Sequence, residues 1–204
     1  MKEKKLLCYS HNDFVSEMSR LGWTERPASD ACVVSISSHL DKEVMMPSGN
    51  YGHHLFPDSD NVLNIDFCDC TPEIWWDGRD RYDELQEFFV LNQSDKTTED
   101  DRRFSYKSEN YGLITCMNYE QAVKIVRFID SHIQRDVNTI YVHCSAGRSR
   151  SQGVVRYVLD TYPDISWTTN PLNPCLTPNY YVVRMLKRAY RLLFIPESEP
   201  VDIV

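Results

Sequence analysis

The chain has 204 residues, of which 42% are hydrophobic, enough for a single domain over residues 1–204 but not for two domains with full cores. The net charge of −8 argues against nucleic acid as a general partner, because phosphate backbones attract basic surfaces. No apolar run approaches the roughly 20 residues of a membrane span, and the apolar part of residues 1–8 is too short for a secretion signal.

Strand and helix patterns alternate in the first third of the chain. Residues 5–9 predict a strand, and residues 12–21 predict a helix. The buried side of this helix should consist of Phe14, Met18 and Leu21. A second strand is expected over residues 31–36, followed by a loop over 41–61 that is rich in proline and glycine. A third strand is indicated by the alternation of Leu63, Ile65 and Phe67.

The stretch from about 72 to 112 interrupts this alternation, and we interpret it as an insertion. A short amphipathic helix is predicted near residues 85–89, whereas residues 92–110 are polar and charged and predict a mobile segment. Two interpretations remain open. The insertion is either a lid or substrate-docking element beside a site, or a surface feature held down by its aromatic residues.

Helical patterns return in the second half of the chain. Asn118 predicts the cap of a helix with apolar positions at Ala122, Ile125, Val126, Ile129 and Ile133. A strand over 139–142 and a helix over 150–159 follow, and a last helix should begin near Thr177-Pro178. Its buried residues should be Val182, Met185, Leu186, Ala189 and Leu193. Strands alternating with helices predict an α/β domain with a mainly parallel central sheet flanked by helices.

The most informative segment runs from His143 to Ser151, between the predicted strand and helix. A loop of this length must curl, and Gly147 permits a backbone conformation that is closed to other residues. The N–H groups of residues 145–150 can then surround one phosphate at the helix N-terminus. Arg150 adds a planar fork that binds two phosphate oxygens at once.

Cys144 would lie beneath the bound phosphate. The helix dipole, the inward N–H groups and Arg150 all favour its thiolate, which is an in-line nucleophile for a phosphoryl group. Ser151 can offer its hydroxyl to the sulfur and help it leave in a second step. We expect His143 to brace the loop through ring hydrogen bonds and to contribute to the stability of the thiolate.

These nine residues resemble the active-site loop of the cysteine-based protein tyrosine phosphatases. The ending Gly-Arg-Ser-Arg-Ser is most similar to the dual-specificity branch, and the Pro178-Asn179 step before the last helix also resembles the family. The resemblance covers roughly residues 31–71 and 113–195, and implies a phosphatase-like fold. It implies phosphate binding by Ser145, Ala146, Gly147, Arg148, Ser149 and Arg150.

A phosphate monoester also needs a general acid for its leaving oxygen. Asp69 lies just past the third strand, in the place where the resemblance puts that acid. Asp66 is the runner-up, although strand alternation turns it away from the face of Phe67. Further candidates lie in the charged run of the insertion, at Asp77, Asp80 and Asp83.

We expect neither a metal nor a cofactor. The histidine pair 53–54 with Cys68 and Cys70 matches no closed zinc set, and residues 58–60 lack the glycine and the terminal glutamate of a calcium loop. The seven cysteines show no framework spacing, which predicts a reducing cytoplasm.

The expected function is hydrolysis of a phosphorylated protein or peptide through a cysteinyl-phosphate intermediate, with no obligate partner evident. Two alternatives remain open. One is a phosphatase of the same fold that acts on phosphoinositides or other non-protein substrates, although Ser145 and Arg148 supply only half of the basic pattern typical of that group. The other is a catalytically dead phosphopeptide-binding module, although the chain keeps the cysteine, the arginine and an acid.

Overall fold

Strands and helices alternate along the chain, as the apolar patterns predict. The computed structural model describes residues 3–38, 54–69, 105–108, 112–170 and 178–195. Its elements are β1 (Lys4–Ser10), α1 (His11–Arg20), β2 (Ala31–Ser37), β3 (Val62–Asp66), β4 (Ser105–Ser108), β5 (Gly112–Thr115), α4 (Tyr119–Gln134), β6 (Thr139–Cys144), α5 (Arg150–Thr161), β7 (Trp167–Thr169) and α6 (Tyr180–Phe194).

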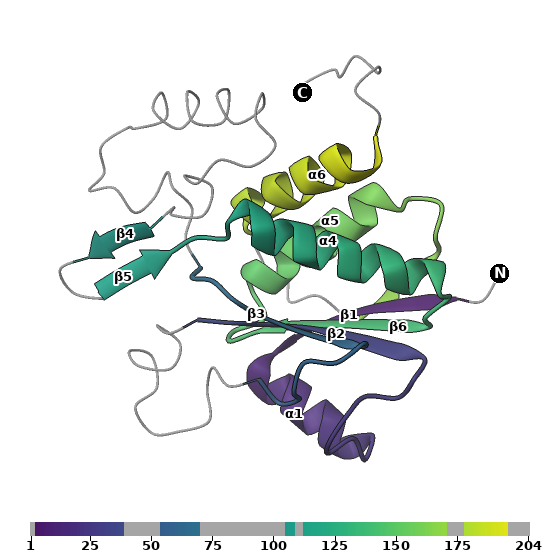
Figure 1. Cartoon of the computed structure of the whole chain (residues 1–204). Coiled ribbons are helices and arrows are strands. Elements are labelled where there is room, and N and C mark those ends of the chain that lie inside the picture. The colour runs from purple at the N-terminus through teal and green to yellow at the C-terminus, as the bar shows by residue number, and fades with distance from the viewer. Residues whose placement is uncertain (1–2, 39–53, 70–104, 109–111, 171–177, 196–204) are drawn as a thin grey trace.

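Five of these strands form a parallel sheet in the order β3-β2-β6-β1-β7, with β6 in the middle. Helices α4, α5 and α6 cover one face of this sheet, and α1 covers the other (Figure 1). The predicted α/β domain with a parallel sheet is therefore confirmed. Since all five strands run the same way, their carboxyl ends share one edge, where Ser10 pairs with Cys144 and Ser37 pairs with Asp66.

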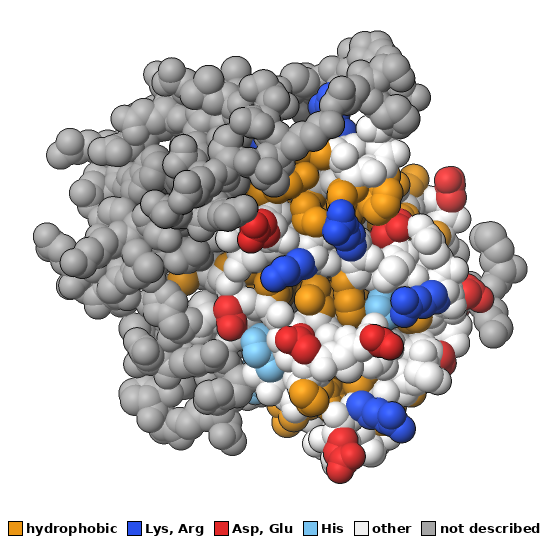
Figure 2. All heavy atoms as spheres, viewed as in Figure 1, with side chains coloured by type: hydrophobic (Ala, Val, Ile, Leu, Met, Phe, Trp, Pro, Cys, Tyr) orange, Lys and Arg blue, Asp and Glu red, His pale blue; other side chains and the backbone are white. Residues whose placement is uncertain are grey.

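The surface carries charges of both signs. On the face that Figure 2 shows, basic and acidic side chains of the described residues are interspersed with apolar ones. None of the described helices is long and apolar enough to cross a membrane. Because the net charge of the chain is −8, a site for a phosphate needs a local source of positive charge, such as a helix N-terminus or a guanidinium.

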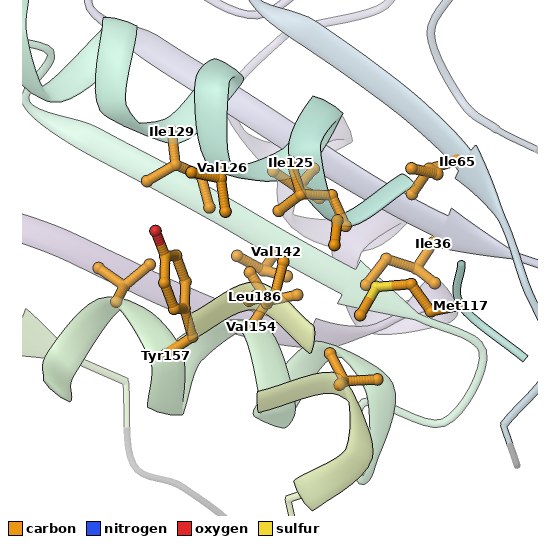
Figure 3. Close-up of a cluster of buried hydrophobic side chains, with 14 of the residues drawn as sticks. Ile36, Ile65, Met117, Ile125, Val126, Ile129, Val142, Val154, Tyr157 and Leu186 are labelled. Atoms are coloured by element: carbon orange, nitrogen blue, oxygen red, sulfur yellow. The ribbon is translucent and has the colours of Figure 1, made fainter. Parts of the chain in front are cut away.

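Two clusters of buried side chains hold the helices to the sheet. The larger one joins α4, α5 and α6 to the sheet, and Figure 3 shows its residues from these helices facing one another. Its labelled members are Ile36, Ile65, Met117, Ile125, Val126, Ile129, Val142, Val154, Tyr157 and Leu186. The smaller cluster packs Phe14 and Met18 of α1 against β2 and β6. The sheet is therefore buried on both faces, as in other parallel sheets.

The helix starts follow from capping side chains. Asn118 caps α4 and forms a reciprocal capping box with Gln121, as the sequence predicts for the start of this helix. The start of α6 differs from the prediction near Thr177-Pro178. Its cap is Asn179, whose side chain accepts a hydrogen bond from the N–H of Val182 at 3.2 Å, so the helix begins at Tyr180.

Three short strands were not predicted. β7 has only three residues, and the side chain of Asn170 extends its pairing by bonding both the N–H and the carbonyl of Cys8. β4 and β5 form an antiparallel pair, so residues 105–108 are a strand within the stretch 92–110 for which we predicted a mobile segment. The predicted helix near 85–89 lies outside the described residues.

The cysteines do not all match the prediction of reduced thiols. Cys8, Cys32, Cys68 and Cys144 are buried and free, as expected. Cys116, by contrast, takes part in a disulfide. This bond was not predicted, because the spacing of the seven cysteines suggests no pairing.

Helices α5 and α6 approach each other most closely at Gly153. A Cβ atom on this residue would lie 2.9 Å from both the Asn179 carbonyl oxygen and the Val182 Cβ. We expect Gly153→Val to lower the free energy of unfolding by about 1–3 kcal/mol, because the two helices must separate. Urea denaturation measures this loss. Arg156→Val, at an exposed position of α5 with one surface ion pair, is the control and should cost at most about 1 kcal/mol. Equal losses in the two variants would contradict the close approach.

Candidate active site

The loop between β6 and α5 lies directly against the junction of β1 and α1. Gly147 has a φ of +65°, and a Cβ atom there would lie 2.5 Å from the Ser10 nitrogen and 2.6 Å from the Tyr9 carbonyl carbon. Only glycine fits this position, because both its conformation and its space exclude a side chain. The N–H of His11 also donates a hydrogen bond to the Ser145 carbonyl at 3.0 Å. The end of β1 and the start of α1 therefore fix the position of the loop.

A second support comes from inside the domain. The buried amide of Gln152 donates hydrogen bonds to the Gly147 carbonyl at 3.2 Å and to the Cys8 sulfur at 2.9 Å. Burial raises the pKa of Cys8 to about 12, so this residue stays a thiol at neutral pH. Sequence reasoning missed Gln152, and the available signal was a polar residue on the buried side of the first turn of a helix.

Cys144 ends the central strand, and its sulfur lies 3.1 Å from the hydroxyl oxygen of Ser151. Both side chains are buried, and Ser151 belongs to the first turn of α5. Ser151 therefore lies where the sequence predicts, within reach of the sulfur. A hydroxyl in this position can donate a hydrogen bond to a thiolate and stabilise its charge.

Arg150 starts α5 at the other end of the loop, and its side chain is 3% exposed. Its Nη1 donates a hydrogen bond to the Phe67 carbonyl at 3.0 Å. This contact joins the loop to the segment that follows β3, two residues before Asp69. The guanidinium therefore connects the two parts of the chain that sequence analysis assigns to one site.

Asp69 contacts the loop itself. Its Oδ1 accepts hydrogen bonds from the Ser149 hydroxyl at 2.7 Å and from the Asn179 amide at 3.0 Å. Asp66, the runner-up, instead contacts the Nε2 of His54 at 3.2 Å. The structure thus brings Asp69 to the loop, while the insertion candidates Asp77, Asp80 and Asp83 lie outside the described residues.

His143 does not brace the loop in the expected way. Its ring stacks on Phe14 with a centroid separation of 4.1 Å, and neither ring nitrogen has a hydrogen-bond partner in the part of the chain that the structure describes. Burial lowers its pKa to about 3, with further contributions from His11, His54 and Arg150. The ring is therefore neutral at physiological pH. The expectation of ring hydrogen bonds was wrong because the side chain points to the apolar α1 side of the sheet.

The remaining loop residues differ in exposure. Ala146 and Arg148 are exposed, whereas Ser145 and Ser149 are partly buried. The hydroxyl of Ser145 is buried and has no hydrogen-bond partner among the described residues. Their role in phosphate binding stays a prediction. Within the described ranges, no three His, Cys, Asp or Glu side chains lie close enough together to hold a metal ion.

No family model, curated protein or solved structure matches the chain. The assignment of a function therefore depends on the geometry of the loop. That geometry combines a buried thiol next to a hydroxyl, a buried guanidinium at the other end of the loop, and a carboxylate that contacts the loop from the segment after β3.

The contact of Gly147 with β1 gives a direct test of the loop. Gly147→Ala should displace the loop and abolish binding of inorganic vanadate, because the new Cβ cannot fit 2.5 Å from the Ser10 nitrogen. Vanadate binding can be measured by isothermal titration calorimetry. Gly22→Ala is the matched control, because Gly22 also has a positive φ, of 73°, but has no atom within 4 Å of its new Cβ. Unchanged vanadate binding in Gly147→Ala would contradict this account of the loop.

Proposed function

We propose that this protein is a phosphomonoester hydrolase of the cysteine-dependent protein tyrosine or dual-specificity type. The observation that carries the proposal is the hydrogen bond between Asp69 and Ser149, which joins a carboxylate to the loop that holds Cys144 and Arg150. A nucleophile, a bidentate cation and a proton donor at one loop are the groups that this reaction needs.

In the first step, the Cys144 thiolate attacks phosphorus opposite the leaving oxygen. A sulfur–phosphorus bond forms while the phosphorus–oxygen bond breaks, and Asp69 gives its proton to the departing oxygen. Arg150 and the N–H groups of the loop bind the three equatorial oxygens, whose charge they stabilise in the transition state. Because the chain as a whole has a net charge of −8, the attraction for the phosphate group must come from these local donors.

In the second step, the Asp69 carboxylate takes a proton from a water molecule that attacks the phosphorylated cysteine. The sulfur–phosphorus bond breaks, and inorganic phosphate leaves. The hydroxyl of Ser151, 3.1 Å from the sulfur, donates a hydrogen bond to the returning thiolate and makes it a better leaving group. The cycle needs no metal ion and returns every group to its starting state.

We propose a phosphorylated protein or peptide as the substrate and the cytoplasm as the location. A nucleophilic thiol must stay reduced, and the cytoplasm keeps thiols in this state. The disulfide at Cys116 argues against a reducing compartment. Reactive thiols can be counted in protein isolated from its cells under non-reducing conditions. An intact disulfide at Cys116 in that protein would argue against the cytoplasm, and reduced cysteines throughout would support it.

The function is tested by a turnover panel of phosphotyrosine peptide, phosphothreonine peptide and phosphoinositide, with excess chelator present. We expect wild-type protein to hydrolyse at least one peptide, and Cys144→Ser to lose turnover but keep vanadate binding, because an alkoxide is far more basic than a thiolate. Hydrolysis of phosphoinositide alone would favour the lipid phosphatase. Binding of phosphopeptide without turnover would favour the dead binding module, and turnover by Cys144→Ser would remove this cysteine from its role.

The role of Asp69 is tested by the leaving group. Asp69→Asn should lower kcat/KM by roughly 10²–10⁴-fold for phenyl phosphate, whose leaving oxygen needs a proton. The loss should be much smaller for an activated aryl ester that departs as an anion. Asp66→Asn is the matched control and should keep both rates, because Asp66 contacts His54 and not Ser149. A loss for phenyl phosphate in Asp66→Asn and not in Asp69→Asn would identify Asp66 as the acid. No loss in either variant would indicate that the acid lies in the insertion.

A further inference from the structure

Asn179 makes two different contacts with the two atoms of its side-chain amide. Its oxygen accepts the N–H of Val182 and caps α6, and its nitrogen donates to the Asp69 carboxylate at 3.0 Å. These contacts fix the orientation of the amide, because the oxygen must face the N–H donor and the nitrogen must face the carboxylate. The residue is buried, so both atoms are held in place.

The backbone of Asn179 is tied to the loop as well. Its N–H donates a hydrogen bond to the carbonyl of Ser149 at 3.1 Å, and the same carbonyl accepts the N–H of Gly153. Ser149 in turn donates its hydroxyl to Asp69. Asn179, Ser149 and Asp69 thus form a closed set of three contacts, in which the carboxylate is held from α6 and from the loop at the same time.

We infer that Asn179 is a positioning residue for Asp69, and that it orients the carboxyl group so that one oxygen is anchored and the other carries the proton. Both donors meet Oδ1, and among the described residues no hydrogen bond reaches Oδ2. A protonated carboxyl group accepts through one oxygen and donates through the other. The two donors therefore place the acidic proton on Oδ2, on the side away from Ser149 and Asn179. This inference rests on the proposed function, because it concerns the proton that Asp69 gives to the leaving oxygen.

The consequence is that a residue 110 positions away from Asp69 controls the geometry of proton transfer. Without the amide donor, the carboxyl group keeps the Ser149 contact as its one hydrogen bond to the described residues, and it can rotate about its side-chain bonds. A general acid must lie within hydrogen-bond reach of the oxygen that it protonates, so rotation lowers the rate only where protonation is needed.

The test uses Asn179→Ser in the full chain. Serine is as good a helix cap as asparagine, so α6 keeps its start, but its hydroxyl is too short to replace the amide donor. We expect kcat/KM to fall by roughly tenfold or more for phenyl phosphate, which is part of the loss expected when the general acid itself is removed. For the activated aryl ester, kcat/KM should fall by less than about threefold, because its leaving group needs no proton. Asn118→Ser makes the same change at the cap of α4 and should leave both rates unchanged.

A double variant separates positioning from general damage. In the Asp69→Asn background, Asn179→Ser should cause no further loss for phenyl phosphate, because the group that it positions is already gone. An equal loss for both substrates, an additive loss in the double variant, or wild-type rates in Asn179→Ser would each overturn the inference. If Asp69→Asn itself shows no dependence on the leaving group, the proposed acid is wrong and the inference falls with it. A selective effect of Asp69→Asn without one of Asn179→Ser rejects the positioning role alone.

Discussion

The close packing of Gly147 against the end of β1 determines the shape of the candidate site. The loop can reach the Ser10 nitrogen only because residue 147 has no side chain, and this approach lets the His11 N–H bind the Ser145 carbonyl. The loop is therefore held between β1, through Gly147, and α5, which starts at Arg150. This arrangement determines the separation between the thiol at the start of the loop and the guanidinium at its end.

Asp69, the proposed acid, comes from a separate segment of the chain. Its segment follows β3, and Arg150 holds the backbone of that segment at Phe67 while Ser149 and Asn179 hold the side chain of Asp69. Arg150, to which we assign phosphate binding, thus also anchors the segment that bears Asp69, so the loop and this carboxylate share one support. The site depends on three regions far apart in the chain: the end of β1, the segment after β3 and the loop after β6. The order of the parallel strands brings all three to one edge of the sheet.

The sequence predicted what depends on local pattern. The strands and helices of the parallel sheet follow from apolar spacing, and the loop from Cys144 to Arg150 follows from its residue types. What it could not predict depends on tertiary contacts. The contact of Asn179 with Asp69 was not predicted, because it needs α6, the loop and the segment after β3 in place. Likewise, the neutral state of His143 follows from burial against Phe14, which no residue beside it in the sequence indicates.

The strand order has a further consequence for local stability. β6, which ends in Cys144, pairs with strands on both sides, whereas β3, which leads to Asp69, is at the border of the sheet and, among the described strands of the sheet, pairs with β2 only. Local opening is easiest where buried contacts and protected backbone hydrogen bonds are fewest, and a border strand has fewer of both than a central one. The loop that we propose binds phosphate thus follows a strand that is paired on both sides, while the proposed proton donor follows a strand at the border of the sheet. We therefore expect local opening to disturb the contacts of Asp69 before it disturbs Cys144.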